Sequence, residues 1–360
     1  EDLRGLPEAP RRLDDTPYRS RFGDPRRVAL AEHGGGEDTE LAVARGLAYL
    51  ASIQGEDGAW GDARLRDRKY RQVAIGKTGL ALLAFLGAGH TPDDGQHAQV
   101  VSRAVEFLLA SQDGRRGHFG DGSAYSHGIA TYALAELFAL TQDERLRAPL
   151  ERAVRQVLRN QVARGDRRLV GGWSYYYADG AVFDRWPRVS ITAWQVMALE
   201  SARLGGLEVP DVAFDAARSF LLRSWDPRLG AFRYSHDPSR LRSGYPTLPG
   251  STPAALFALG LLGVDVADEP FAPARRFTLE RAPAGWRWRG DDAFVSRASG
   301  NLYFWYYGSL ALFRLGGKEW ERWNVALKET LLPAQQPDGS WEPLDVYARY
   351  AGDDAGDRSY

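Results

Sequence analysis

The feature that most constrains this chain is a repeat. Six times, a helical and apolar stretch leads into a turn that contains glycine and ends in an aromatic residue. A repeat of roughly 50–60 residues indicates that one supersecondary unit is used over and over. The six turns run from Gln54 to Trp60, Gln112 to Phe119, Gln161 to Trp173, Trp225 to Phe232, Gly285 to Trp286 and Gln335 to Trp341.

Two kinds of helix alternate between these turns. Residues 39–53 place apolar residues at helical spacing beside a charged face, whereas residues 73–87 are apolar and small almost throughout. We therefore predict an all-α fold, in which amphipathic outer helices and buried inner helices form hairpins that close into an (α/α)6-type toroid. The alternation returns over 98–111 and 126–140, 147–163 and 187–203, 211–224 and 250–262, and 268–280 and 301–315.

An unbroken repeat favours one large domain, with three segments along the chain. Residues 1–38 are rich in Arg, Pro, Asp and Gly and are predicted to be an irregular extension; residues 39–345 form the toroid. Residues 346–360 are a polar tail that follows an outer helix at 319–335, so we expect the sixth inner helix to be absent. Because the chain begins with Glu1 and not Met, we also expect it to be part of a larger polypeptide.

The turns carry residues with clear structural roles. Asp-Gly and Gly-Gly pairs form turns because glycine accepts a positive φ. Ser126, Ser190, Ser251 and Asn301 stand where inner helices are expected to begin, as N-caps. For the aromatic residue that ends each turn, packing between hairpins is the favoured interpretation over ligand contact.

Composition excludes several kinds of chemistry. The chain has no cysteine, which removes disulfides, thiolate nucleophiles and Cys-ligated zinc. Its net charge of −1 gives no general attraction to nucleic acid. The six histidines lack metal-binding spacing, and no apolar run approaches the ~20 residues of a membrane span. We predict no metal and no cofactor, and favour a periplasmic or exported location slightly over the cytoplasm.

The repeat resembles that of squalene–hopene cyclases and of the β subunits of protein prenyltransferases. The runs from Val189 to Leu199 and from Asn301 to Gly308 are similar to bacterial proteins, common in planctomycetes, that carry the prenyltransferase and squalene oxidase repeat. The resemblance covers about residues 38–345 and implies a terpenoid cyclase-like toroid. It does not by itself imply an activity, because one fold hosts many chemistries.

The residues that these families need for their chemistry are missing from this sequence. Class II cyclases use an Asp-x-Asp-Asp acid, but the equivalent segment from Leu248 to Ala255 has no carboxylate. Asp291 and Asp292 are the remaining adjacent acidic pair near an inner helix, and they fall in a loop that reads as exposed. The zinc site of prenyltransferases and the thioester of complement-type domains both need cysteine.

A site is expected at the polar mouth of the ring, near the inner-helix N-termini. We predict His127 as a general acid or base, with Asp184 or Tyr125 as its partner. The alternative for His127 is a structural role, hydrogen-bonded inside the ring. Aromatic rings beside arginine suit a polar ligand, such as a sugar or an acidic group. The predicted ligand-binding residues are Arg71, Tyr175, Trp186, Arg188, His236, Tyr245, Asn301, Tyr303 and Trp305.

Two functions remain open on the sequence. The first is a non-catalytic recognition or scaffold domain that binds a polar small molecule or a protein partner at this mouth. It is favoured because the acid and metal ligands of the families are missing while the repeat is intact. The alternative is a diverged enzyme that uses the toroid cavity, either a terpenoid-type cyclase or a carbohydrate-active lyase or hydrolase.

Overall fold

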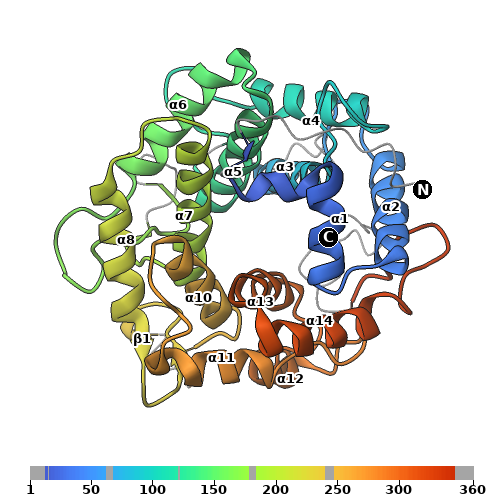
Figure 1. The fold of residues 1–360 in the computed structure, drawn as a ribbon. Coiled ribbons are helices and arrows are strands. Elements are labelled where there is room, and N and C mark those ends of the chain that lie inside the picture. Colours follow the sequence, from blue (N-terminus) through green and yellow to red (C-terminus); the bar gives the residue numbers. More distant parts are fainter. Residues whose placement is uncertain are drawn as a thin grey trace.

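The protein is a closed ring of helices in two layers (Figure 1). The structure, a computed structural model, describes residues 13–14, 16–61, 68–120, 122–177, 184–239 and 247–344; for residues 68–72 it describes the backbone alone. The outer helices are α2 (Glu37–Ser52), α4 (Ala98–Ala110), α6 (Glu144–Arg159), α8 (Asp211–Ser224), α11 (Ala272–Leu279) and α14 (Gly317–Leu331). The inner helices are α3 (Arg68–Gly87), α5 (Ala124–Thr141), α7 (Val189–Leu204), α10 (Ser251–Leu261) and α13 (Leu302–Leu315). This arrangement confirms the predicted α/α toroid.

Smaller elements join or flank the two layers. A short antiparallel pair, β1 (Trp225–Asp226) and β2 (Ala231–Phe232), forms the fourth turn, with Trp225 opposite Phe232. The remaining helices are η3 (Pro17–Arg21), α1 (Gly23–Glu32), η4 (Glu269–Phe271) and α12 (Asp291–Arg297). Asp291 and Asp292 begin α12 and are exposed. Within the described residues, no helix is long and apolar enough to cross a membrane.

The burial of each helix follows the pattern that its sequence carries. Inner helix α5 is buried almost all round, whereas outer helix α6 buries a single stripe. That stripe recurs every three or four residues, which places it on the one face that packs against the inner layer. It consists of Leu146, Leu150, Ala153, Val154 and Val157, with Gln156 beside it.

In four of the six turns, a glutamine joins the turn to the next outer helix. The side-chain Nε2 of Gln161 donates to the carbonyl of Gly171 in its own turn, at 3.0 Å, and to that of Ala213 in α8, at 2.9 Å. One side chain therefore ties two neighbouring repeats together. Gln54, Gln112 and Gln335 each make the equivalent pair of hydrogen bonds.

The last of these glutamines closes the ring. Gln335 Nε2 donates to the carbonyl of Ala42 in α2, at 2.8 Å and 293 positions away in the sequence. Beside it, Gly46 of α2 approaches the Trp341 ring so closely that a Cβ at Gly46 would lie 3.5 Å from it. The first and last outer helices are thus joined by the same contact that joins α2 to α4, α4 to α6 and α6 to α8.

In the same four turns, a glycine allows this close approach. Gly171 has a φ of +96°, and a Cβ there would lie 1.9 Å from the carbonyl oxygen of Ala216 in α8. Any other residue would combine a strained backbone with a steric clash. Gly58, Gly117 and Gly339 meet the next outer helix in the same way, at Arg103, Arg152 and Arg45.

The turn aromatics lie in the core, as the packing interpretation predicts. Trp60, Phe119, Trp173 and Phe232 are each at most 1% exposed, while Trp286 and Trp341 are partly exposed. The backbone N–H of Trp60 donates to the Thr78 hydroxyl at 3.0 Å. The N–H groups of Trp173 and Phe232 donate in the same way to Thr192 and Thr252.

Three of the four predicted N-caps are wrong. Asn301 does cap α13, because its side chain accepts from the N–H of Phe304 at 2.9 Å. Ser126 and Ser190 lie inside the first turns of α5 and α7, and Ser251 is the first residue of α10. Helices α5 and α7 begin where bridges to neighbouring turns, Ser123 to Tyr176 and Arg188 to Ser235, hold the N-cap residue in extended conformation.

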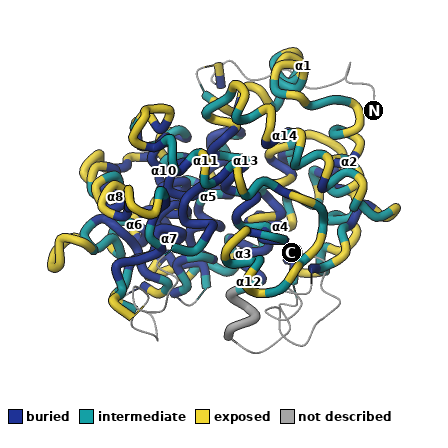
Figure 2. The backbone as a smooth tube through the Cα atoms, turned by 90° about the horizontal axis from the view of Figure 1, so that it is seen from below, coloured by how far each residue is buried: buried dark blue, intermediate teal, exposed yellow. Residues whose placement is uncertain are grey.

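The N-terminal extension is not irregular throughout, which corrects the prediction for residues 1–38. Residues 16–36, here called the N-terminal arm, contain η3 and α1 and lie at one end of the ring (Figure 2). Arg26 of α1 donates to the carbonyl of Ala88 at the end of α3, and it pairs with Glu40 of α2 at 2.6 Å. These tertiary contacts stabilise a short helix that its own sequence signals only weakly. Residues 346–360, and with them the predicted loss of the sixth inner helix, lie outside the described residues.

Candidate functional site

The inner helices begin at the end of the ring opposite the arm, and six side chains gather there. Because each inner helix follows an antiparallel outer helix, all inner N-termini point to the same end. Tyr125 lies in the first turn of α5, Arg188 precedes α7, and Tyr303 lies in the first turn of α13. Together with neighbouring loop residues they form what we call the mouth cluster: Tyr125, Tyr175, Asp184, Arg188, Tyr234 and Tyr303.

Arg188 is the charged centre of the mouth cluster. Its side chain is 9% exposed, and its guanidinium carbon lies 5.3 Å from the ring centre of Tyr175 and 5.6 Å from that of Tyr234. Of the carboxylates that the structure describes, the nearest is Asp184, whose Oδ1 lies 3.6 Å from Nη1, beyond hydrogen-bond distance. Nε and Nη1 are buried and have no hydrogen-bond acceptor among the described residues. A guanidinium is charged at any physiological pH, so this is a buried cation with unused donors.

Asp184 orients the loop that leads into α7. Its Oδ2 accepts a hydrogen bond from the N–H of Tyr175 at 3.1 Å, and its Oδ1 accepts one from the N–H of Trp186 at 3.0 Å. Both carboxylate oxygens are therefore held by backbone donors. This geometry fixes the position of Asp184 beside Arg188.

The tyrosines of the mouth cluster contact one another. The hydroxyls of Tyr175 and Tyr234 share a hydrogen bond, and the rings of Tyr125 and Tyr175 lie 5.6 Å apart. Burial is the main cause that raises the pKa of Tyr125, Tyr234 and Tyr303 above that of free tyrosine. Each phenol thus keeps its proton at neutral pH and can donate a hydrogen bond.

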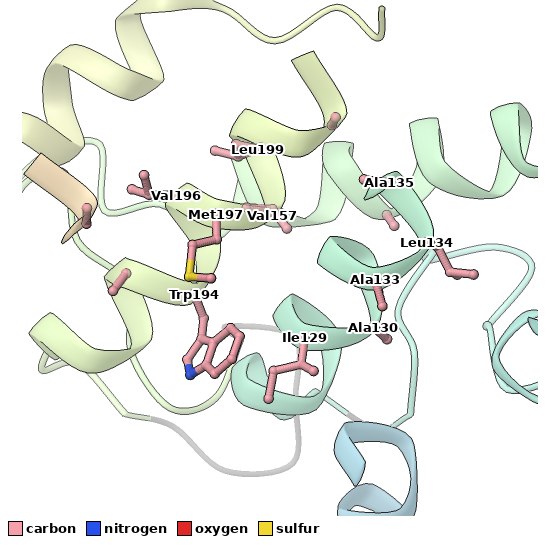
Figure 3. Close-up of a cluster of buried hydrophobic side chains, with 14 of the residues drawn as sticks. Ile129, Ala130, Ala133, Leu134, Ala135, Val157, Trp194, Val196, Met197 and Leu199 are labelled. Atoms are coloured by element: carbon pink, nitrogen blue, oxygen red, sulfur yellow. The ribbon is translucent and has the colours of Figure 1, made fainter. Parts of the chain in front are cut away.

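One side of the ring interior is filled by aromatic side chains. Trp194 projects from α7 beside Ile129 of α5 (Figure 3). Its indole stacks on Tyr306 of α13, with ring centres 5.5 Å apart, and meets Tyr307 edge-on. Helices α7 and α13 therefore touch across the interior. On the accessible side, residues of α3, α5 and α13 keep exposed surface.

Partly exposed tyrosines line this accessible side. Tyr132 lies seven residues after Tyr125 on the same face of α5, and both keep some accessible surface. Tyr303 and Tyr306 do the same on α13, and Leu80 of α3 is 42% exposed. An interior surface rich in phenol groups thus continues from the mouth cluster into the ring.

A buried carboxylate, Glu136, lies deeper in the ring and was not predicted as a site residue. Its side chain is 1% exposed, and its Oε1 accepts a hydrogen bond from Arg21 of the N-terminal arm at 2.7 Å. Oε2 has no hydrogen-bond partner. Beside this pair, the Tyr18 hydroxyl hydrogen-bonds Ser201 of α7 at 2.9 Å. The sequence does carry a signal, because Glu136 is the one Asp, Glu, Lys or Arg within α5.

His127, the predicted acid or base, accepts a hydrogen bond from the turn of its own repeat in this structure. The N–H of Phe119 donates to its Nδ1 at 3.0 Å, so the neutral ring carries its proton on Nε2, which lies 3.1 Å from the carbonyl of Ala153. Burial, followed by the neighbouring His118, lowers the pKa of His127 to about 3. Neither Asp184 nor Tyr125 is among its hydrogen-bond partners within the described residues. This geometry favours the structural alternative over acid/base catalysis.

The other predicted residues are spread over several places. His236 packs on Phe220 of outer helix α8, and burial lowers the pKa of its imidazole to about 4. Trp305 packs against Trp286, towards the outer layer, and Asn301 is the N-cap of α13. Trp186 lies under the guanidinium of Arg185 on the loop before α7. Tyr245 lies outside the described residues, as does the side chain of Arg71.

The described residues hold no group of three His, Asp or Glu side chains that could bind a metal ion. The functional groups described at this site are neutral phenols, the buried cation Arg188 at the mouth and the buried carboxylate Glu136 in the interior. Such groups can bind a polar molecule and can exchange protons with it.

Comparison with known proteins shows the fold alone. No family model matches the sequence, and no curated protein is significantly similar to it. A crystal structure of a protein from Actinoplanes is similar, with a TM-score of 0.54 and 19% identity over 85% of this chain and 84% of that one. The type II terpene cyclase MstE from Scytonema has a TM-score of 0.56 and 14% identity, over 85% and 82%. A D-mannose isomerase has a TM-score of 0.59 and 10% identity, over 84% and 87%. The chain is thus an α/α toroid that resembles terpene cyclases and isomerases.

Proposed function

We propose that the protein is a carbohydrate-active enzyme, a lyase or hydrolase, that binds its substrate inside the ring. The observation that carries this proposal is the partly exposed row of tyrosines at 125, 132, 303 and 306. Neutral phenols offer hydrogen bonds to hydroxyl groups, and their rings offer flat apolar faces to a sugar. The polar small molecule expected at the mouth is, on this proposal, the substrate.

The same surface is less suited to a hydrocarbon. A polyprenyl chain would bury phenol hydroxyls without replacing their hydrogen bonds to water, which costs about 1–3 kcal/mol for each group. Arg188 at the mouth and Arg21 in the interior would also repel a carbocation. The fold supports both chemistries, since MstE is described in complex with geranylgeranyl dihydroxybenzoate and the other relative is an isomerase of D-mannose. The groups lining this interior favour the sugar.

The test is a binding and turnover panel. Acidic and neutral oligosaccharides and geranylgeranyl diphosphate are titrated by calorimetry, and the sugars are then assayed for new reducing ends and for unsaturated products. We expect a sugar to bind and to be cleaved, and Tyr132→Phe and Tyr306→Phe each to weaken binding by up to about tenfold. Tyr176→Phe is the matched control, because Tyr176 is 37% exposed on a loop outside the interior.

Each other outcome contradicts the proposal in its own way. Binding of geranylgeranyl diphosphate alone would favour a terpenoid-type cyclase. Sugar binding without cleavage would favour a recognition domain. A panel without any binding would favour a scaffold that recognises a protein partner.

A further inference from the structure

We propose that Arg188 binds a carboxylate of the ligand, so that the substrate is a sugar acid. This inference rests on the proposed function and deepens it, because it names the group that the mouth cluster recognises. Three independent features of Arg188 support it: its unused donors, its place at a helix N-terminus and the two tyrosine rings that flank it.

The first feature is a buried cation that its neighbours satisfy only in part. Burying a charged group is costly unless it is both paired and hydrogen-bonded. The side chain of Arg188 is 9% exposed; among the described residues its nearest carboxylate is 3.6 Å away, and two of its nitrogens lack an acceptor. Asp184 already accepts two backbone hydrogen bonds, which hold it in place. An oxyanion on the ligand would supply the missing acceptors.

The second feature is the position of Arg188 as the N-cap of α7. The N-terminus of a helix carries a partial positive charge, so a cation there is unfavourable and an anion is favourable. The N-termini of α5, α10 and α13 lie at the same end of the ring. Arg188 adds positive charge where the helix N-terminus is already positive, and this arrangement is expected where an anion binds.

The third feature is the pair of tyrosine rings that flank the guanidinium. Tyr175 and Tyr234 lie within cation–π distance of Arg188, and these rings offer its N–H groups no carboxylate acceptor. The planar edge of a guanidinium matches a planar carboxylate with two parallel hydrogen bonds. Arg188 and Asp184 together carry no net charge, so this site disfavours a phosphate dianion more than a carboxylate monoanion. We therefore choose the carboxylate, with a sugar phosphate as the competing ligand.

The experiment is calorimetry on the full chain with three matched probes: D-glucuronate, D-glucose 6-phosphate and D-glucose. We expect the wild type to bind D-glucuronate at least about tenfold more tightly than either other sugar. Arg188→Met should remove this preference, whereas Arg188→Lys, which keeps the charge and loses the planar edge, should retain part of it. Arg185→Met is the control, since Arg185 is an exposed cation on the same loop; its D-glucuronate affinity should stay within about twofold of wild type.

Thermal unfolding of each variant shows whether a loss of binding is a loss of fold. Arg188→Met should melt within a few degrees of the wild type, because Asp184 keeps its two backbone hydrogen bonds. Equal D-glucuronate affinity in wild type and Arg188→Met would overturn the inference and leave the proposed function standing. Preference for the phosphate, or equal affinity for D-glucose, would overturn the carboxylate. A wild type that binds none of the three sugars contradicts the proposed function as well.

Discussion

At position 127 the repeat uses a histidine where neighbouring repeats use a threonine. Thr78, Thr192 and Thr252 each accept the N–H of a turn aromatic through the side-chain hydroxyl. His127 does so through Nδ1, and its buried imidazole also contacts the carbonyl of Ala153. The difference is that a histidine can be protonated, which makes this one turn sensitive to acid.

We expect His127→Thr to change the pH dependence of stability. The folded pKa of His127, about 3, lies below the unfolded value of about 6.5, so the unfolded chain takes up the proton first. Wild-type stability therefore falls by about 1.4 kcal/mol per pH unit below 6.5, and the variant lacks this loss. At pH 7.5 the variant should be less stable by roughly 1–3 kcal/mol, because the Ala153 carbonyl loses its donor.

Urea unfolding between pH 7.5 and 4.5 measures this directly. The gap between the two proteins should narrow as the pH falls. A constant gap would mean that His127 is not a neutral group in the folded core. Enzyme activity retained in His127→Thr would further favour the structural interpretation of this residue.

At the scale of elements, the turn glycines set how closely each hairpin sits on the next outer helix. Gly171 and Gly165 lie in the same loop with φ values of +96° and +106°. A Cβ at Gly171 would clash with the backbone of α8, whereas a Cβ at Gly165 would meet nothing within 4 Å. The two positions therefore separate backbone strain from close approach.

Alanine at the two positions should have unequal effects. Gly165→Ala should cost about 1–2 kcal/mol, which is the price of a positive φ alone. Gly171→Ala should cost roughly 3 kcal/mol or more, because α8 must also move. Thermal or denaturant unfolding gives both values. Similar losses would show that the contact between this turn and α8 is not tightly packed.

At the scale of the whole molecule, the N-terminal arm links elements that the repeat does not. Arg21 reaches Glu136 in α5, Tyr18 reaches Ser201 in α7, and Trp320 of α14 donates to the carbonyl of His33 at 2.9 Å. The arm thus ties together the C-terminal ends of inner helices and the outer helices α2 and α14. Its strongest electrostatic contact is the buried Arg21–Glu136 pair.

We expect Arg21→Met to destabilise the protein by about 3 kcal/mol, because it leaves the Glu136 carboxylate buried without a cation. Glu136→Gln should rescue much of this loss, so a double-mutant cycle should give a coupling of at least about 1 kcal/mol. The exposed pair Arg27 and Asp24 in the same arm is the control, with an expected coupling below about 0.5 kcal/mol. Equal couplings for the two pairs would show that the arm does not hold Arg21 in the ring.

The sequence by itself determined the two-layer toroid. Helical periodicity separates buried helices from amphipathic ones, and the Gln, Gly and aromatic positions mark each turn, because these signals are local and occur several times. It also placed Tyr125, Tyr175, Asp184, Arg188 and Tyr303 near one mouth, since all inner helices begin at the same end.

Only the tertiary structure decided which polar groups meet. His127 and Thr192 have the same role, although their side chains differ, because that role depends on a turn N–H brought close by packing. The buried Glu136 pairs with Arg21, which is 115 positions away in the sequence. The helical order of the arm depends on the ring that it contacts. Contacts of this kind are set by how the ring closes, which no local pattern records.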